Sequence, residues 1–184
     1  VFIWNSYPRT GLPQASVSIP DYLDRRAQAP AIEDATLFSQ RSVSLADGGT
    51  PEQVRALRVT PSFFSTLGRT PQLGRAFTEA EATSGAERFT ILTFGLWQAR
   101  FAGETSVVGR DVRLDGVPYR VVGVLPADFE LPVRDIALLV PFAFAPDETD
   151  ARPLLCEVRS AANALQIGRV GEDAITLAPC GFRK

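Results

Sequence analysis

Apolar and polar positions alternate along much of the chain and divide it into short predicted strands. Residues 1–7 are apolar and aromatic and predict a buried strand. Residues 32–46 predict one or two strands, and residues 54–59 predict another. Because a Gly-rich turn signal at 47–49 joins these two segments, the pattern indicates a β-hairpin.

Capping residues predict two helices, and the spacing of apolar residues predicts a third. Ser18 opens the first of them. Thr60 is the expected N-cap of the second helix, with Pro61 at its first position and Gly68 at its left-handed end. The third helix covers residues 94–101, where apolar residues recur at helical spacing.

Further short elements follow from local patterns. Thr78 and Glu81 have the spacing of a capping box, which predicts that a short helix begins there. Residues 89–93 and 137–140 predict two more strands, and Pro141 closes the second.

The strongest turn signal is the pair Asp115-Gly116, which lies between two runs of alternating apolar residues. Asp-Gly at this place is typical of a type I′ hairpin, because both central residues need positive φ. Gly123, in the second run, indicates a bulge or a close backbone approach. Strands, hairpins and helices alternate irregularly, so the fold class we predict is α+β with a mixed sheet.

Composition agrees with a folded, globular chain. The 184 residues fit one domain or two small lobes that share a core, and 45% of them are hydrophobic. The formal net charge is −2, and the Arg residues are scattered among acids. Because no basic stripe is present, we expect no binding of nucleic acid. No initiator Met or signal peptide is seen, so we expect a soluble piece of a longer protein.

The chain contains no His, which removes the usual general base and the commonest metal ligand. Catalytic Ser-His-Asp and Cys-His sites are therefore excluded. Cys156 and Cys180 do not fit a zinc pattern, and they are either unpaired or joined by a disulfide. We expect no catalytic, cofactor-binding or metal-binding residues and no cofactor.

Other candidate groups have a structural explanation. We expect solvated surface positions for the acids of the loop-and-helix region, Glu79, Glu81 and Glu87. Asp21 and Asp24 favour the dipole of the first helix. The glycines of 168–171 lack the spacing of a phosphate loop. We assign core packing rather than ligand binding to a set of aromatic residues, Phe63, Phe64, Phe94, Trp97 and Phe101.

Several segments, in order and spacing, resemble the family of MacB-like periplasmic core domains. The match covers roughly residues 15–142, and the segments that carry it are VTPSFFSTLG (59–68), LGRAF (73–77), ILTFGLWQ (91–98), VGR (108–110), LDG (114–116) and YRVVGVLP (119–126). Physical reasons explain many of these residues as helix ends and turns, so the resemblance identifies a scaffold rather than an active site.

The resemblance implies a mixed-sheet, porter-like α/β lobe built from both chain ends, with an inserted second α+β lobe that contains the β-hairpin. The boundaries we expect are 1–58 and 137–184 for the porter-like lobe and 59–136 for the inserted lobe. The end of the chain departs from the family pattern, because no long amphipathic helix is evident over residues 176–184.

The resemblance also implies a function. The chain would be the extracytoplasmic, periplasmic domain of an ABC-transporter permease in a bacterial inner membrane, and would relay ATP-driven change to a substrate or partner protein. Its implied partners are a cytoplasmic ATPase domain or subunit, reached through membrane helices, a second permease copy, and a periplasmic protein or hydrophobic cargo. The alternatives are a stand-alone periplasmic binding or scaffold module and a carboxylate-dependent hydrolase.

Overall fold

The computed structural model describes residues 2–7, 12–15, 19, 22, 32–46, 50–83, 88–143, 155–160 and 174–178. Most of these residues form strands: β1 (Phe2–Tyr7), β2 (Leu12–Ala15), β3 (Ile32–Ala46), β4 (Glu52–Val59), β5 (Leu73–Gly74), β6 (Phe89–Leu92), β7 (Asp111–Leu114), β8 (Val117–Val124), β9 (Leu138–Pro141), β10 (Leu155–Ser160) and β11 (Ala174–Ala178). The helices are α2 (Phe63–Leu67), α3 (Phe94–Phe101) and two short 3-10 turns, Glu79–Ala82 and Thr105–Val107. Parallel and antiparallel pairs occur together, so the sheet is mixed, as predicted.

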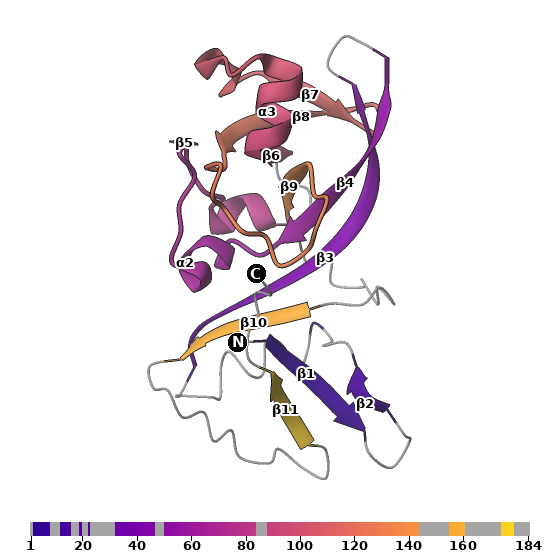
Figure 1. The fold of residues 1–184 in the computed structure, drawn as a ribbon, viewed down its shortest axis with the longest axis vertical. Helices are drawn as coiled ribbons and strands as arrows, with labels where there is room; N and C mark the ends of the chain where they lie inside the picture. Colours follow the sequence, from indigo (N-terminus) through magenta and orange to yellow (C-terminus); the bar gives the residue numbers. More distant parts are fainter. Residues whose placement is uncertain are drawn as a thin grey trace.

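The longest strand, β3, belongs to two groups of strands. Its first part pairs with β10, which also pairs with β1, and its later part pairs with β4 from Phe38 to Leu45. Figure 1 shows β3 running from the part that holds β1, β2, β10 and β11 into the part that holds α2, α3 and the other strands. One 15-residue strand therefore connects both parts.

The second group of strands closes on itself. β4 pairs with β9, β9 with β6, and β6 with β8. β7 then pairs with both β8 and the end of β3, at Leu45 and Ala46. The strands β3, β4, β9, β6, β8 and β7 thus form a ring, and closure removes the exposed edges of these strands along most of the ring.

Two buried clusters lie on the two faces of this ring. One cluster takes residues from each ring strand and fills the inside: Val43, Leu45, Ala56, Leu92, Val112, Leu114, Val121, Val124, Leu138 and Val140, with Phe101 of α3 and Val107. The second contains no residue of β7 and lies outside, under α2: Phe38, Leu57, Val59, Phe63, Phe64, Phe77, Ile91, Val122, Leu125, Ile136 and Leu139. Alternation of side chains along the strands explains this division, and the register shift at Gly123 places Val121 and Val124 of β8 in the same cluster.

Most strands appear where the pattern predicts them. The segment 32–46 is one strand rather than two, and it forms the expected antiparallel hairpin with β4. The turn at 47–49 lies outside the described residues. Of the first predicted helix the structure describes Ile19 and Tyr22, and both are helical. Among the described residues, no helix has the length and apolar character needed to cross a membrane.

The helix after β4 begins later than predicted. Phe63 is its first residue and Ser62 its N-cap, so the assignment of Thr60 as the cap is wrong. The Thr60 hydroxyl instead accepts a hydrogen bond from the backbone of β3, which competes with the helix for it. The helix ends at the left-handed Gly68, as expected.

Gly123 makes the close approach that its position in β8 predicts. A Cβ atom there would lie 2.8 Å from the Arg75 carbonyl oxygen, and a Cβ on Gly74 would lie 2.1 Å from the Val122 carbonyl oxygen. The pairing of β6 and β8 also shifts register at Thr90/Ile91, opposite this point. The glycines allow the two-residue strand β5 to cover the end of β8.

The turn between β7 and β8 has the predicted geometry, with φ of 52° at Asp115 and 80° at Gly116. The space around Gly116 is open, since no heavy atom lies within 4 Å of a Cβ built there. A side chain at this position would therefore strain the backbone without causing a clash.

We predict that Gly116→Val lowers the free energy of unfolding by about 1–3 kcal/mol through backbone strain. Gly95→Ala is the matched control, because Gly95 lies in α3 with equally open space and alanine favours a helix. Urea unfolding of both variants measures the difference. Equal midpoints for Gly116→Val and the unmodified domain would contradict the strain.

Candidate functional site

Three hydroxyl side chains gather where β3 passes from β10 to β4. Thr36 lies on β3, and Thr60 and Ser62 lie between β4 and α2. All three are buried, with 0%, 2% and 7% of their surface exposed, respectively. We call Thr36, Thr60 and Ser62 the hydroxyl junction.

The hydrogen bonds of the hydroxyl junction form one directed chain. Ser62 Oγ donates to the Ala35 carbonyl oxygen at 2.6 Å, which uses its single proton. Thr60 Oγ1, 3.0 Å from Ser62 Oγ, must then donate to Ser62. Thr36 Oγ1, 2.8 Å away, donates in turn to Thr60, which also accepts from the Leu37 backbone N–H at 3.1 Å.

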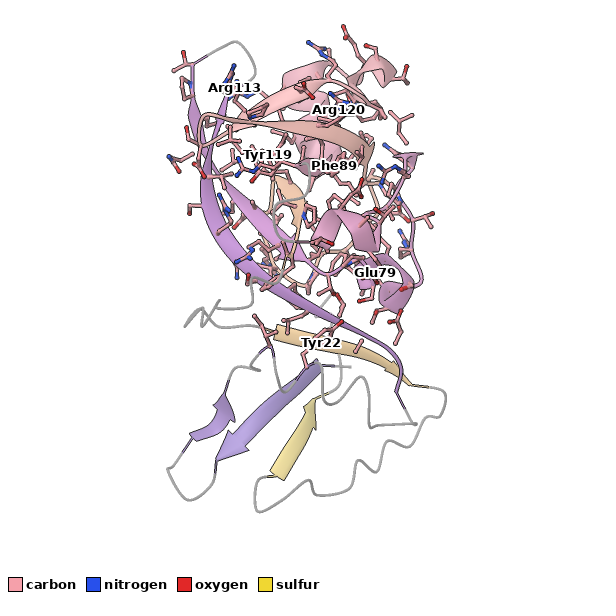
Figure 2. The ribbon with its side chains drawn as sticks, turned by 180° about the vertical axis from the view of Figure 1, so that it is seen from behind. Tyr22, Glu79, Phe89, Arg113, Tyr119 and Arg120 are labelled. Atoms are coloured by element: carbon pink, nitrogen blue, oxygen red, sulfur yellow. The ribbon has the colours of Figure 1, made fainter. Side chains whose placement is uncertain are left out.

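Two further contacts attach neighbouring elements to the same stretch of β3. The buried Tyr22 hydroxyl donates to the Ala35 carbonyl oxygen at 3.0 Å, and Figure 2 shows Tyr22 beside the region where β3 runs past β10. Ser65 of α2 donates to the Asp34 carboxylate. The helical residue 22, α2 and β3 are thus held together at the place where β3 changes its pairing partner.

The arrangement is suited to holding elements together rather than to catalysis. The Asp34 carboxylate accepts a hydrogen bond from Ser65, and the chain has no His to act as a general base beside it. Within the described ranges, no group of three or more Cys, Asp or Glu side chains is placed to hold a metal ion. Buried hydroxyls that satisfy one another instead fix one geometry of the backbone.

The acids that the sequence analysis placed on the surface differ in their surroundings. Glu79 is exposed, as expected. Glu81 is 8% exposed, so the prediction of a solvated side chain is wrong for it. The sequence positions Glu87, Asp21 and Asp24 lie outside the described residues.

Glu81 is buried because partners compensate its charge. Arg75 binds its carboxylate with two nitrogens, at 2.6 and 3.0 Å, and the Thr78 backbone N–H donates to it at 2.8 Å. Thr78 and Glu81 thus form the predicted capping box. Burial alone would raise the pKa of Glu81, but the hydrogen bonds from Arg75 and Thr78 and the Arg75 charge hold that pKa below its usual value.

The aromatic residues divide between the two cores. Phe63 and Phe64 are buried outside the ring, and Phe101 is buried inside, which confirms core packing for these three. Trp97 packs partly against the inner cluster, and Phe94 meets it edge-on with ring centroids 5.7 Å apart. Cys156 lies on β10 opposite Leu37. The remaining sequence candidates, Cys180 and the glycines of 168–171, fall outside the described residues.

Comparison with known families decides the identity of the domain. The family model described as the MacB-like periplasmic core domain matches residues 1–168. The chain belongs to this family. It is therefore the periplasmic or extracellular domain of a MacB-like ABC-transporter permease, in agreement with the resemblance found in the sequence.

Solved structures share the fold of this MacB-like domain. The periplasmic region of MacB from Actinobacillus actinomycetemcomitans superposes with a TM-score of 0.66 at 16% identity, covering 90% of this chain and 76% of that one. The extracellular domain of the ABC-type transporter YknZ from Gram-positive bacteria gives a TM-score of 0.66 at 18% identity, covering 89% and 84%. No curated protein matches the chain.

The hydroxyl junction of this MacB-like domain was not predicted from the sequence. Thr60 has the local signature of a helix cap, and this signature gives no sign of its tertiary partners. A signal was present, because the polar Thr36 interrupts the apolar run of Ala35, Leu37 and Phe38. Polar residues in such a strand indicate that another element supplies hydrogen bonds.

We predict that Thr60→Val lowers the free energy of unfolding by about 1–3 kcal/mol, because the Thr36 hydroxyl and the Leu37 N–H lose their acceptor. Thr50→Val makes the same chemical change at an exposed position and should cost less than about 0.5 kcal/mol. Urea unfolding compares the two. Similar losses in both variants would show that the junction contributes nothing specific.

We also predict that the Glu81 carboxylate makes stability depend on pH. Because its pKa is lower in the folded state, its contribution is complete above the pKa of the unfolded chain, about 4.3, and is lost as the pH falls through the lowered value. Glu81→Gln should therefore flatten the fall in the thermal midpoint below about pH 4.5. Glu79→Gln, at an exposed position, serves as the control. An unchanged pH profile in Glu81→Gln would contradict the role of the carboxylate.

Proposed function

We propose that this domain relays ATP-driven movement of its permease to a substrate or partner protein outside the cytoplasm, and that it performs no chemistry of its own. The observation that carries the proposal is the single strand β3, which pairs with β10 at one end and with the ring strands at the other. At the usual rise per residue, its 15 residues extend over about 50 Å.

A relay needs an element that runs without a break from one lobe to the other, so that displacement of one lobe reaches the other. β3 meets this need because β4 covers one edge from Phe38 to Leu45, and β10 covers the other edge from Ile32 to Phe38. The hydroxyl junction lies where these two ladders meet and fixes α2 to the strand. Movement of β10 is therefore transferred to the ring through a hydrogen-bonded path.

We further propose that two lobes move against each other, with boundaries at 1–58, 59–136 and 137–184. Strand pairing favours a different position for the boundaries of the second lobe. β4 and β9 pair with each other, and both contribute to the cores of the ring. The ring lobe would then begin inside β3, near Phe38, and include β4 and β9.

The proposed absence of catalysis is supported by the missing His and by a junction in which each hydroxyl serves as a hydrogen-bond partner. The ATPase would act from the cytoplasm through the membrane helices of the permease. A second permease copy would complete the assembly, and a periplasmic protein or hydrophobic cargo would receive the movement.

We predict that ATP changes the distance between the two lobes in the full-length permease. Spin labels at Ser106→Cys and Ser160→Cys, in a background with Cys156 and Cys180 replaced by Ser, report this distance by double electron–electron resonance. A non-hydrolysable ATP analogue should shift the main distance peak. A label pair at positions 50 and 106, within the ring lobe, should not shift. Identical distributions with and without nucleotide for the 106–160 pair would disprove the relay.

A further inference from the structure

One edge of β3 has a gap in its pairing. The edge that faces β4 is paired from Phe38 to Leu45. The opposite edge is paired by β10 up to Phe38 and by β7 only at Leu45 and Ala46. Among the described strands, none pairs with residues 39–44 along this opposite edge, between the two ladders.

The hydrogen bonds show which backbone N–H and C=O groups of this segment face the edge opposite β4. The Leu37 carbonyl oxygen accepts from the Thr60 N–H, on the β4 side. Backbone groups alternate along a strand, so those of Gln40, Ser42 and Ser44 point to the opposite edge. The side chains of Gln40 and Ser42 are exposed.

Asp115 closes one end of the gap by taking the place of a strand residue. Its N–H donates to the Ser44 carbonyl oxygen at 2.9 Å, and its carboxylate accepts from the Ser44 N–H at 2.8 Å. The open edge therefore consists of the N–H and C=O groups of Gln40 and Ser42. The open groups recur every second residue, and an extended peptide presents its own backbone N–H and C=O groups at the same spacing.

A continuation of β10 and a second copy are poor occupants of this edge. If the register of β10 continued, position 153 would lie opposite Gln40, and Pro153 has no N–H to donate to a ladder. A second copy could offer its own β3 only by bringing along its β10 and β7, which flank the same edge. Those strands would meet β10 and β7 of the first copy.

We propose that the open edge of β3 at Gln40–Ser42 binds a short extended segment of a partner protein by strand addition. The segment is limited to the space between Phe38 and Ser44, where the flanking ladders begin. Arg41, between the two open residues, has a side chain that is 30% exposed and paired with Asp115. A carboxylate opposite Arg41 in the added strand would form a favourable cross-strand pair, so we expect an acidic residue there.

This inference rests on the proposed function, since it names the kind of partner that the relay would act on. An added strand would lie between β10 and β7 and so would contact both groups of strands. The two proposals fail separately, because peptide binding is measured without nucleotide and the lobe distance is measured without peptide.

The test uses the full-length permease in nanodiscs and a phage-displayed library of random linear peptides. Recovered peptides are synthesised, and their affinity is measured by fluorescence polarisation for Gln40→Pro, Ser42→Pro, Gln40→Ala and Ser42→Ala. Proline removes an outward N–H and leaves the ladder with β4 intact. Loss of one or two hydrogen bonds should weaken binding about tenfold in the proline variants, whereas the alanine variants should stay within about threefold.

Hydrogen exchange on the unmodified permease gives a second readout that does not depend on how the proline variants fold. The backbone amides of Gln40 and Ser42 should become protected when peptide is added, and the backbone amide of the exposed Thr70 should not. The inference is overturned if no peptide is recovered, if proline and alanine variants bind alike, or if the two amides gain no protection. It is also overturned if proline at these positions separates permease copies, because the edge would then join two copies.

Discussion

The structure depends on the pairing of one strand with two sets of neighbours. β3 supplies the ladder for β10 and the ladder for β4, and it also receives β7 at its end. A slip of one residue in this strand would turn its inner residues, Val43 and Leu45, toward solvent and would separate Thr36 from Thr60. The ring, the outer core and the hydroxyl junction therefore share one register.

That register explains why buried polar groups are concentrated at the junction. Where β10 and β4 meet on β3, two ladders on opposite edges of the strand must be joined to a helix, α2. Apolar packing there is adaptable and would permit several positions of α2. Hydroxyl groups that must each find a partner restrict the helix to one position. Such a joint keeps α2 attached to β3 while displacement passes between the two groups of strands.

Much of the fold could be predicted from the sequence because tight turns and helix ends require particular residues. Asp115-Gly116 needs positive φ at both residues, and Thr78 and Glu81 satisfy a helix end within four residues. The start of α2 and the burial of Glu81 could not be predicted in this way. The Thr60 hydroxyl accepts a hydrogen bond from the Leu37 N–H, and the Glu81 carboxylate accepts one from Arg75 on the preceding segment. These tertiary partners override the local preference of Thr60 for a helix cap and of Glu81 for solvent. The site was missed for the same reason, since its hydrogen bonds join Thr60 and Ser62 to residues of β3 that lie 24 and 27 positions away.

The ring also has a consequence for the order in which the domain can fold as it leaves the cytoplasm. The hairpin of β3 and β4 is local and can form as soon as residue 59 is exposed. β9, the parallel neighbour of β4, pairs Leu138 with Ala56 and so arrives about eighty residues later along the chain. Until then β4 presents an unpaired edge that is prone to aggregation, and Arg55 and Arg58 within this strand supply charges that discourage wrong pairing. During secretion the domain therefore passes through an intermediate with an open β4 edge, and the charged residues of β4 itself reduce its aggregation.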